Sequence, residues 1–206
     1  MARPKIVRIS REKAAEASLE VIDEEGLDNF RITKVAKRLK VSAPSLYYHF
    51  EGREELLAEV SRLLFLKSKI PPIDRKSDWR EGILNVALNS WRSALRHPNA
   101  APLLLKFFPR ALMIDSYDQW IQVFEINEVP IEWHLKILEG SENLTFGSAL
   151  FAAAQRPSAG GEHLRHDDLA RANDHAHYSA AVLAADPDEE ARFIDNMRAY
   201  LRGLPF

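Results

Sequence analysis

The sequence predicts an all-α protein with a small N-terminal three-helix domain and a larger C-terminal helical bundle. Apolar residues recur at helical spacing along most of the 206 residues, and the chain has neither an alternating strand pattern nor an Asn-Gly or Asp-Gly hairpin turn. Pro71 and Pro72 interrupt the helical pattern. We therefore expect a domain of residues 1–52, a connecting helix within 53–70 and a second domain of residues 71–206.

The composition excludes several classes of protein. The chain has no cysteine, which excludes disulfides, thiol catalysis and cysteine-bound zinc and suits a reducing compartment. No apolar run approaches the roughly 20 residues of a membrane span, and the N-terminus has no apolar core of a signal peptide. We expect a cytoplasmic protein without a membrane partner.

The first helix is expected from Ser10, a good N-cap residue, to Gly26, which ends it. Ala15, Leu19 and Ile22 form its apolar stripe. This helix should pack behind the two short helices that follow.

Those two helices are expected over residues 32–39 and 43–50. Apolar residues at i, i+3, i+4 and i+7 give the first one a buried face: Ile32, Val35, Ala36 and Leu39. Ser42 is expected to cap the second, and Leu46 should face inward. Its outward residues combine small apolar groups with hydroxyl and imidazole groups that can reach phosphates and base edges: Ala43, Pro44, Ser45, Tyr47 and His49.

Residues 31–50 carry basic side chains and no acidic one, in a chain whose net charge is -2: Arg31, Lys34, Lys37, Arg38 and Lys40. This local bias favours a polyanionic partner. The alternative is a solvated basic face on a helical hairpin.

The run V-A-K-R-L-K-V-S-A-P-S-L-Y-Y-H-F, followed by E-L-L in the next helix, resembles the DNA-binding domain of the TetR family of transcriptional regulators. The resemblance covers about residues 11–64 and continues more weakly to the C-terminus. It implies that residues 32–50 form a helix-turn-helix that reads double-stranded operator DNA. The expected phosphate contacts are Thr33, Lys34, Tyr48, His49 and Arg53, and the residues expected nearest the bases are Ala43, Pro44, Ser45 and Tyr47. Ser42 is expected to be a further DNA-binding residue.

Three positions depart from the family pattern. Arg31 stands where a capping Thr or Ser is common, and Arg53 where a Lys is common. Lys40 stands where the turn usually has Gly, and a non-glycine residue in the left-handed conformation costs roughly 1 kcal/mol.

Further helices are expected over residues 53–69, 79–96, 100–108, 114–125, 131–155 and 188–202. The resemblance implies a homodimer in which residues 131–155 and 188–202 pair with their copies as a four-helix bundle. Small residues such as Ala149 and Ala153 would then lie at the dimer interface. The alternative is that these stripes belong to the core of one chain.

Aromatic residues are concentrated in the second half, and four of them are candidates to line a cavity for an apolar or aromatic effector: Trp91, Phe107, Phe124 and Phe151. The alternative is an ordinary core. The segments W-R…H-P and L-T-F-G-S-A-L resemble the tetracycline-repressor branch of the family. The His and Glu with which that branch holds a magnesium-chelated drug fall at Leu104 and Phe151, so we expect neither that effector nor a cofactor.

His and Asp residues are frequent in the irregular segment 157–177, which raises a metal site as an alternative to a solvated surface: His163, His166, Asp167, Asp168, Asp174, His175 and His177. The sequence predicts that the protein is a sequence-specific DNA-binding transcriptional regulator and not an enzyme. We expect a repressor that a small effector releases from its operator. The alternatives are a ligand-independent regulator and a metal-dependent enzyme using His163–His177.

Overall fold

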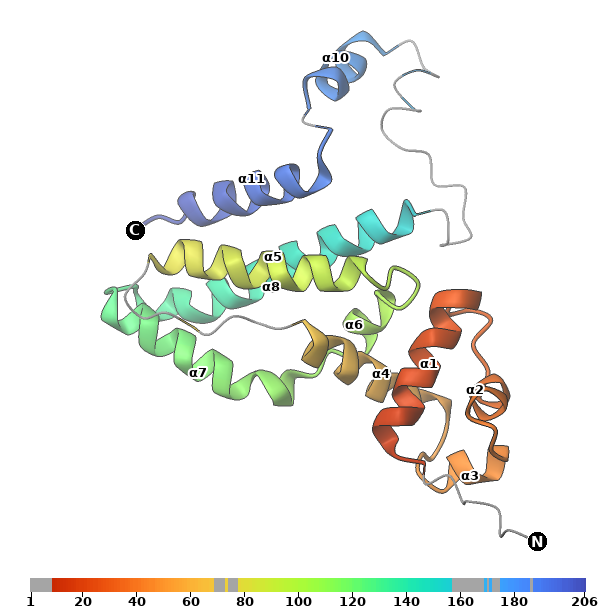
Figure 1. The fold of residues 1–206 in the computed structure, drawn as a ribbon. Helices are drawn as coiled ribbons and strands as arrows, with labels where there is room; N and C mark the ends of the chain where they lie inside the picture. The colour runs from red at the N-terminus through yellow and green to blue at the C-terminus, as the bar shows by residue number, and fades with distance from the viewer. Residues whose placement is uncertain are drawn as a thin grey trace, which may run out of the picture.

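The computed structural model describes residues 9–68, 73, 78–156, 169, 171, 175–185 and 187–206. All regular structure within them is helical, and none of these helices is long and apolar enough to span a membrane. In chain order (Figure 1) the helices are α1 (Arg11–Glu25), α2 (Ile32–Leu39), α3 (Ala43–Tyr47), α4 (Arg53–Lys67), α5 (Trp79–Leu95), α6 (Pro102–Lys106), α7 (Arg110–Ile126), α8 (Ile131–Ala154), α10 (Ala176–Ala184) and α11 (Glu189–Arg202).

Helix α1 has the ends that the sequence predicts. The Ser10 hydroxyl accepts a hydrogen bond from the backbone N–H of Lys13, at 3.2 Å. Gly26 ends the helix at φ 82°, and its N–H donates to the carbonyl of Ile22. Ile22 is fully buried behind α2 and α3, together with Phe30. Both capping predictions are therefore confirmed.

The turn between α2 and α3 is tight although it has no glycine. Lys40 has φ 56° and ψ 43°, the left-handed conformation expected of this position. The N–H of Val41 donates to the carbonyl of Ala36 at 3.0 Å, which closes the end of α2. The departure from glycine at position 40 thus leaves the turn intact.

Helix α3 differs from its prediction in two respects. It ends at Tyr47 rather than at Phe50, but a backbone bond from Phe50 to the carbonyl of Leu46 keeps the Phe50 side chain buried. Ser42 holds the N-cap position without capping the backbone, because its hydroxyl lies 2.8 Å from that of Ser45.

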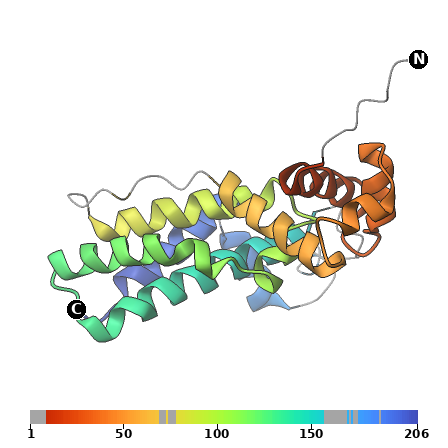
Figure 2. The ribbon, with the colours of Figure 1, turned by 90° about the horizontal axis from the view of Figure 1, so that it is seen from below.

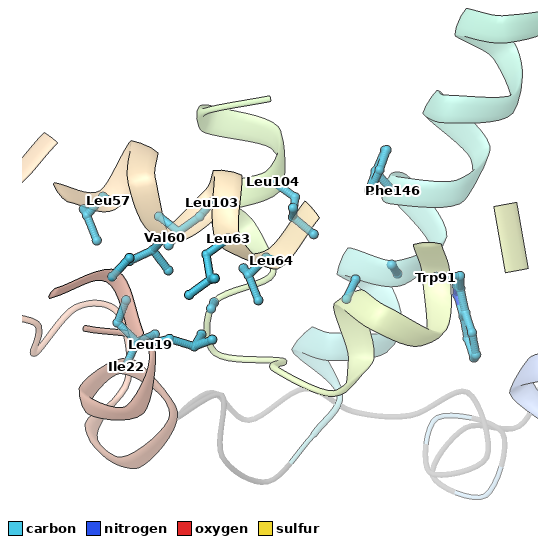
Figure 3. Close-up of a cluster of buried hydrophobic side chains, with 14 of the residues drawn as sticks. Leu19, Ile22, Leu57, Val60, Leu63, Leu64, Trp91, Leu103, Leu104 and Phe146 are labelled. Carbon is cyan, nitrogen blue, oxygen red and sulfur yellow. The ribbon is translucent and has the colours of Figure 1, made fainter. Parts of the chain in front are cut away.

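Helix α4 connects the N-terminal helices to the bundle (Figure 2). Leu57, Val60 and Leu64 face Leu19 and Ile22 of α1 and the leucines of α6 (Figure 3). The hydrophobic core therefore continues through α4 into the second half of the chain.

In the second half, α8 packs along α5, with α7 on one side and α11 on the other (Figure 1). Helix α6 covers Pro102–Lys106 rather than residues 100–108, and two further helices differ from the prediction. Helix α7 begins at Arg110 rather than at residue 114, since Pro109 precedes the first turn without interrupting it. Helix α10 was not predicted: alanine favours a helix there, and none of its residues is buried.

The small residues of α8 serve the chain's own bundle. Ala149 and Ala153 are 1% and 2% exposed. A Cβ atom at Gly140 would collide with the ring of Tyr200, so Gly140 permits the close approach of α11. Placing Ala149 and Ala153 at a dimer interface was therefore wrong, because the helices of one chain already cover them.

Replacing Lys40 by glycine tests the left-handed turn. Lys40→Gly should raise the free energy of unfolding by about 0.5–1 kcal/mol, because it removes the steric cost of a side chain at φ 56°. The matched change Lys37→Gly, in the exposed interior of α2, should lower it by about 1 kcal/mol. Urea denaturation of both variants measures this; equal destabilisation by the two would contradict the turn geometry.

Candidate nucleic-acid interface and internal cavity

One side of α3 and the turn after it project into solvent. Tyr47 is 54% exposed and Tyr48 87% exposed, while Leu46 and Phe50 anchor the segment from beneath. Pro44 is exposed on the same segment. This surface presents two phenol rings whose hydroxyl groups can donate to phosphates or base edges.

The other residues predicted on this face are less accessible. Ala43 is half-buried and packs against the core. Ser45 is half-buried beside Ser42, and the half-buried ring of His49 meets that of Tyr48 edge-on at 5.3 Å. The accessible part of α3 is thus narrower than predicted, because Ala43 packs against the core and Ser45 lies against Ser42.

Arg11 fixes the end of this segment, whereas the sequence indicated it only as part of a basic arm, with Arg3, Lys5, Arg8 and Lys13, that could lie along a phosphate backbone. Arg11 donates to the carbonyl of His49 at 2.6 Å, forms an ion pair with Glu55 at 2.7 Å and lies 4.4 Å from the centre of the Phe50 ring. The backbone N–H of Glu51 and the Arg11 guanidinium together lower the pKa of Glu55. Nothing in a helix-opening arginine marks this role in the sequence.

Acidic residues of α1 form ion pairs with two of the basic residues of α2. Lys34 pairs with Glu25 and also donates to a loop carbonyl, and Arg38 pairs with Glu20 and Glu24. The hydrogen bonds that Arg38 donates to the carboxylates of Glu24 and Glu20 raise the pKa of Arg38. The basic surface is therefore partly neutralised on its α1 side.

The two remaining predicted contacts, Thr33 and Arg53, differ in accessibility, and two further lysines of the basic stretch follow Thr33 in the chain. Thr33, Lys37 and Lys40 are exposed, and neither lysine forms an ion pair within the described part of the chain. Arg53 instead lies 5.7 Å from the centre of the Phe30 ring and 3.4 Å from the carbonyl of Leu27. Thr33, Lys37 and Lys40 thus leave the outer side of α2 and the turn open to a polyanion.

A cavity lies between α4, α5, α7 and α8. It holds about 510 Å³ free of protein atoms, part of it open to solvent, and the centre of a water-sized sphere can reach only about 60 Å³ of it. Its aromatic walls are Phe65, Tyr117, Trp120 and Phe146. The space is apolar and narrow.

The polar end of the cavity is formed by α7 and α8. The Tyr117 hydroxyl donates to Glu142, and the Arg110 guanidinium lies 3.7 Å from the same carboxylate. Burial raises the pKa of Glu142, and burial together with that carboxylate raises the pKa of Tyr117. Next to them, the buried hydroxyl of Ser141 has no hydrogen-bond partner within the described residues.

The structure does not bring the four predicted ligand residues together. Trp91 stacks on Phe193 and Phe124 is completely buried, whereas Phe151 is 77% exposed. Phe107 packs against the core beside Lys106. None of the four lines the cavity, because helical spacing does not distinguish a core aromatic from one at a cavity wall.

Most of the suggested metal cluster lies outside the described residues: His163, His166, Asp167, Asp168 and Asp174. His175 and His177 are exposed on or beside α10. Within the described residues, no group of three or more potential ligands could hold a metal ion.

Comparisons with known proteins agree with this geometry. Residues 15–60 match the family model "Bacterial regulatory proteins, tetR family". The tetracycline repressor protein class D of Escherichia coli is 23% identical over 206 residues, covering 97% of this chain and 90% of that protein. The class H repressor of Photobacterium damsela subsp. piscicida gives the same values.

Solved structures share the fold. A possible TetR family transcriptional regulator from Streptomyces coelicolor A3(2) superposes with a TM-score of 0.79 at 23% identity, covering 95% of this chain and 98% of that one. ActR of Streptomyces coelicolor, in complex with actinorhodin, has a TM-score of 0.74 at 19% identity, with the same coverage. The family-model match falls on α1 to α4, the helices that build and support the projecting face of α3. Residues 15–60 therefore match the N-terminal domain of the TetR family, and the chain shares its fold with solved TetR family regulators.

Proposed function

We propose that the protein is a homodimeric cytoplasmic repressor that leaves its operator when an apolar or aromatic molecule enters the cavity. One observation carries this proposal: Phe65 of α4 forms part of the cavity wall, and the same helix packs against α1. Helix α1 lies behind α3 and the turn after it, residues 43–50, which we call the reading segment. A ligand in the cavity would therefore press on the helix that supports the DNA-binding residues.

For DNA contact, the proposal gives the central role to the accessible face of α3. Tyr47 and Pro44 would lie nearest the bases, with Ser42 at the start of the helix and Tyr48 toward the phosphates. Ala43, Ser45, His49 and Arg53 would mainly position that face, since each is at least partly covered.

Two residues of α2 would contact the backbone differently. Thr33 is exposed and can reach a phosphate directly. Lys34 would have to exchange Glu25 for a phosphate, because the carboxylate already holds its ammonium group. Exchanging one exposed ion pair for another changes the free energy of DNA binding little. Lys34 would therefore contribute mainly to the salt dependence of DNA binding.

The proposed dimer uses the uncovered part of α8. A Cβ atom at Gly147 would meet nothing within 4 Å, and the neighbouring Phe151 is 77% exposed. Exposed apolar groups of this kind are what a four-helix interface between two copies would bury. Two copies are needed because a pair of reading helices, about 34–36 Å apart, matches successive turns of the major groove.

Release would follow from the narrowness of the cavity. The walls leave only about 60 Å³ to the centre of a water-sized sphere, so a ring-sized molecule that enters would press on them. The Ser61 hydroxyl donates to the carbonyl of Phe107 at 3.0 Å, which ties α4 to the end of α6 and restricts how it can move. A ligand that binds the displaced arrangement better shifts the population away from the DNA-binding one.

The main alternative is a regulator without a ligand, which would have a solid second domain. The cavity, and the buried Ser141 hydroxyl that has no partner within the described residues, favour a regulator that responds to a ligand. ActR, solved with actinorhodin, supports ligand binding by this fold.

Tyr47→Ala should weaken operator binding by about 1–3 kcal/mol, because it removes a projecting side chain that the core does not need. A mobility-shift titration on the protein's own promoter region measures the loss. Ile126→Ala, an equally exposed residue at the far end of α7, serves as the control and should bind normally. Unchanged affinity in Tyr47→Ala would show that another surface reads the DNA.

Phe151→Asp should convert the dimer to a monomer, because a carboxylate would be buried without a partner at the interface. Sedimentation at micromolar concentration tests this, with Ile114→Asp on the exposed face of α7 as the matched control. A dimeric Phe151→Asp protein, or a monomeric wild type, would contradict the proposed interface.

A further inference from the structure

We propose that the cavity selects a neutral, flat aromatic molecule that carries one hydrogen-bond donor, held between Ser141 and Glu142. This inference rests on the proposed function, since it names the chemical class of the effector. It follows from the shape of the walls, from an unpaired hydroxyl and from the charge at the polar end.

The walls favour a flat molecule. Phe65, Trp120 and Phe146 approach from three helices, and the accessible space between them is small. Trp120 lies directly against the backbone of α5, since a Cβ atom at Gly82 would be only 2.8 Å from the edge of its indole ring. Aromatic faces so close together accept another ring more readily than a bulky aliphatic group.

Ser141 indicates that the molecule carries a polar group. Its side chain is 6% exposed, lines the cavity and leaves its hydroxyl oxygen without a partner in the described structure. The adjacent Thr145 cannot satisfy it, because the Thr145 hydroxyl donates to the backbone carbonyl of Ser141 at 2.7 Å. A buried polar group without a partner is unfavourable, and a ligand hydroxyl or amine would remove that penalty.

Glu142 determines the charge that the site accepts. Among the described residues that line the cavity it is the one with a formal charge, and the Arg110 guanidinium lies 3.7 Å away from it. A ligand anion would meet a carboxylate in a poorly hydrated space, which disfavours it. A ligand cation would have to displace Arg110, whereas a neutral donor can bond to the carboxylate and leave the ion pair in place.

Four compounds with the same ring system test this with the full-length protein: 2-naphthol, naphthalene, 2-naphthoate and the cation of 2-naphthylmethylamine. Equilibrium dialysis measures each dissociation constant without DNA. 2-Naphthol should bind about tenfold more tightly than naphthalene, the effect of one additional hydrogen bond in a buried site. 2-Naphthoate and the cation should bind more weakly than 2-naphthol.

Two variants separate the roles of the polar groups. Ser141→Ala should reduce the affinity for 2-naphthol by about tenfold and leave naphthalene unchanged, so naphthalene also reports whether the cavity is still folded. Glu142→Gln removes the negative charge and should bring the dissociation constant of 2-naphthoate closer to that of 2-naphthol.

The outcomes distinguish this inference from the proposed function. Equal affinities for 2-naphthol and naphthalene would overturn the donor requirement and leave a ligand cavity. Tightest binding of 2-naphthoate or of the cation would overturn the requirement for neutrality. If none of the four compounds binds, both the inference and the ligand part of the proposed function are wrong.

Discussion

The structure depends on helix α4, which packs against α1 at one end and forms part of the cavity wall at the other. Leu57 and Val60 bury themselves against α1, while Phe65, less than two turns further along, forms part of the cavity wall. The buried hydroxyl of Ser61 lies between them and bonds to the carbonyl of Phe107. Because close-packed side chains transmit displacements rather than absorb them, α4 cannot move at the cavity without changing its contact with α1.

The reading segment is held by polar contacts rather than by its own length. A five-residue α3 would not be stable alone, and Arg11 joins its end to α1 and α4 through His49, Phe50 and Glu55. The ion pairs of α1 with Lys34 and Arg38 add a second link along α2. A displacement of α4 would therefore move α1, and α1 would move α3 with it.

The local signals of the sequence predicted local structure well. Ser10, Gly26 and the stripe from Ile32 to Leu39 give the ends and faces of α1 and α2, and the left-handed conformation of Lys40 follows from its place in the turn. The cavity could not be predicted in this way. Phe124 and Trp120 share one helix, and only the packing of its neighbours decides that the first is core and the second a wall. The same holds for Ala149, which its own chain covers.

The coupling between the cavity and the DNA-reading helix α3 can be tested by measuring the distance between the two copies of α3 in the dimer. The chain has no cysteine, so a spin label on Glu51→Cys, at an exposed position that is not among the proposed DNA contacts, reports the separation of the two reading segments in the dimer. Ala87→Phe places a ring in the cavity without any ligand. The account predicts that this change shifts the label-to-label distance away from the operator-bound value and weakens operator binding. An unchanged distance, with the ring seated in the cavity, would contradict it.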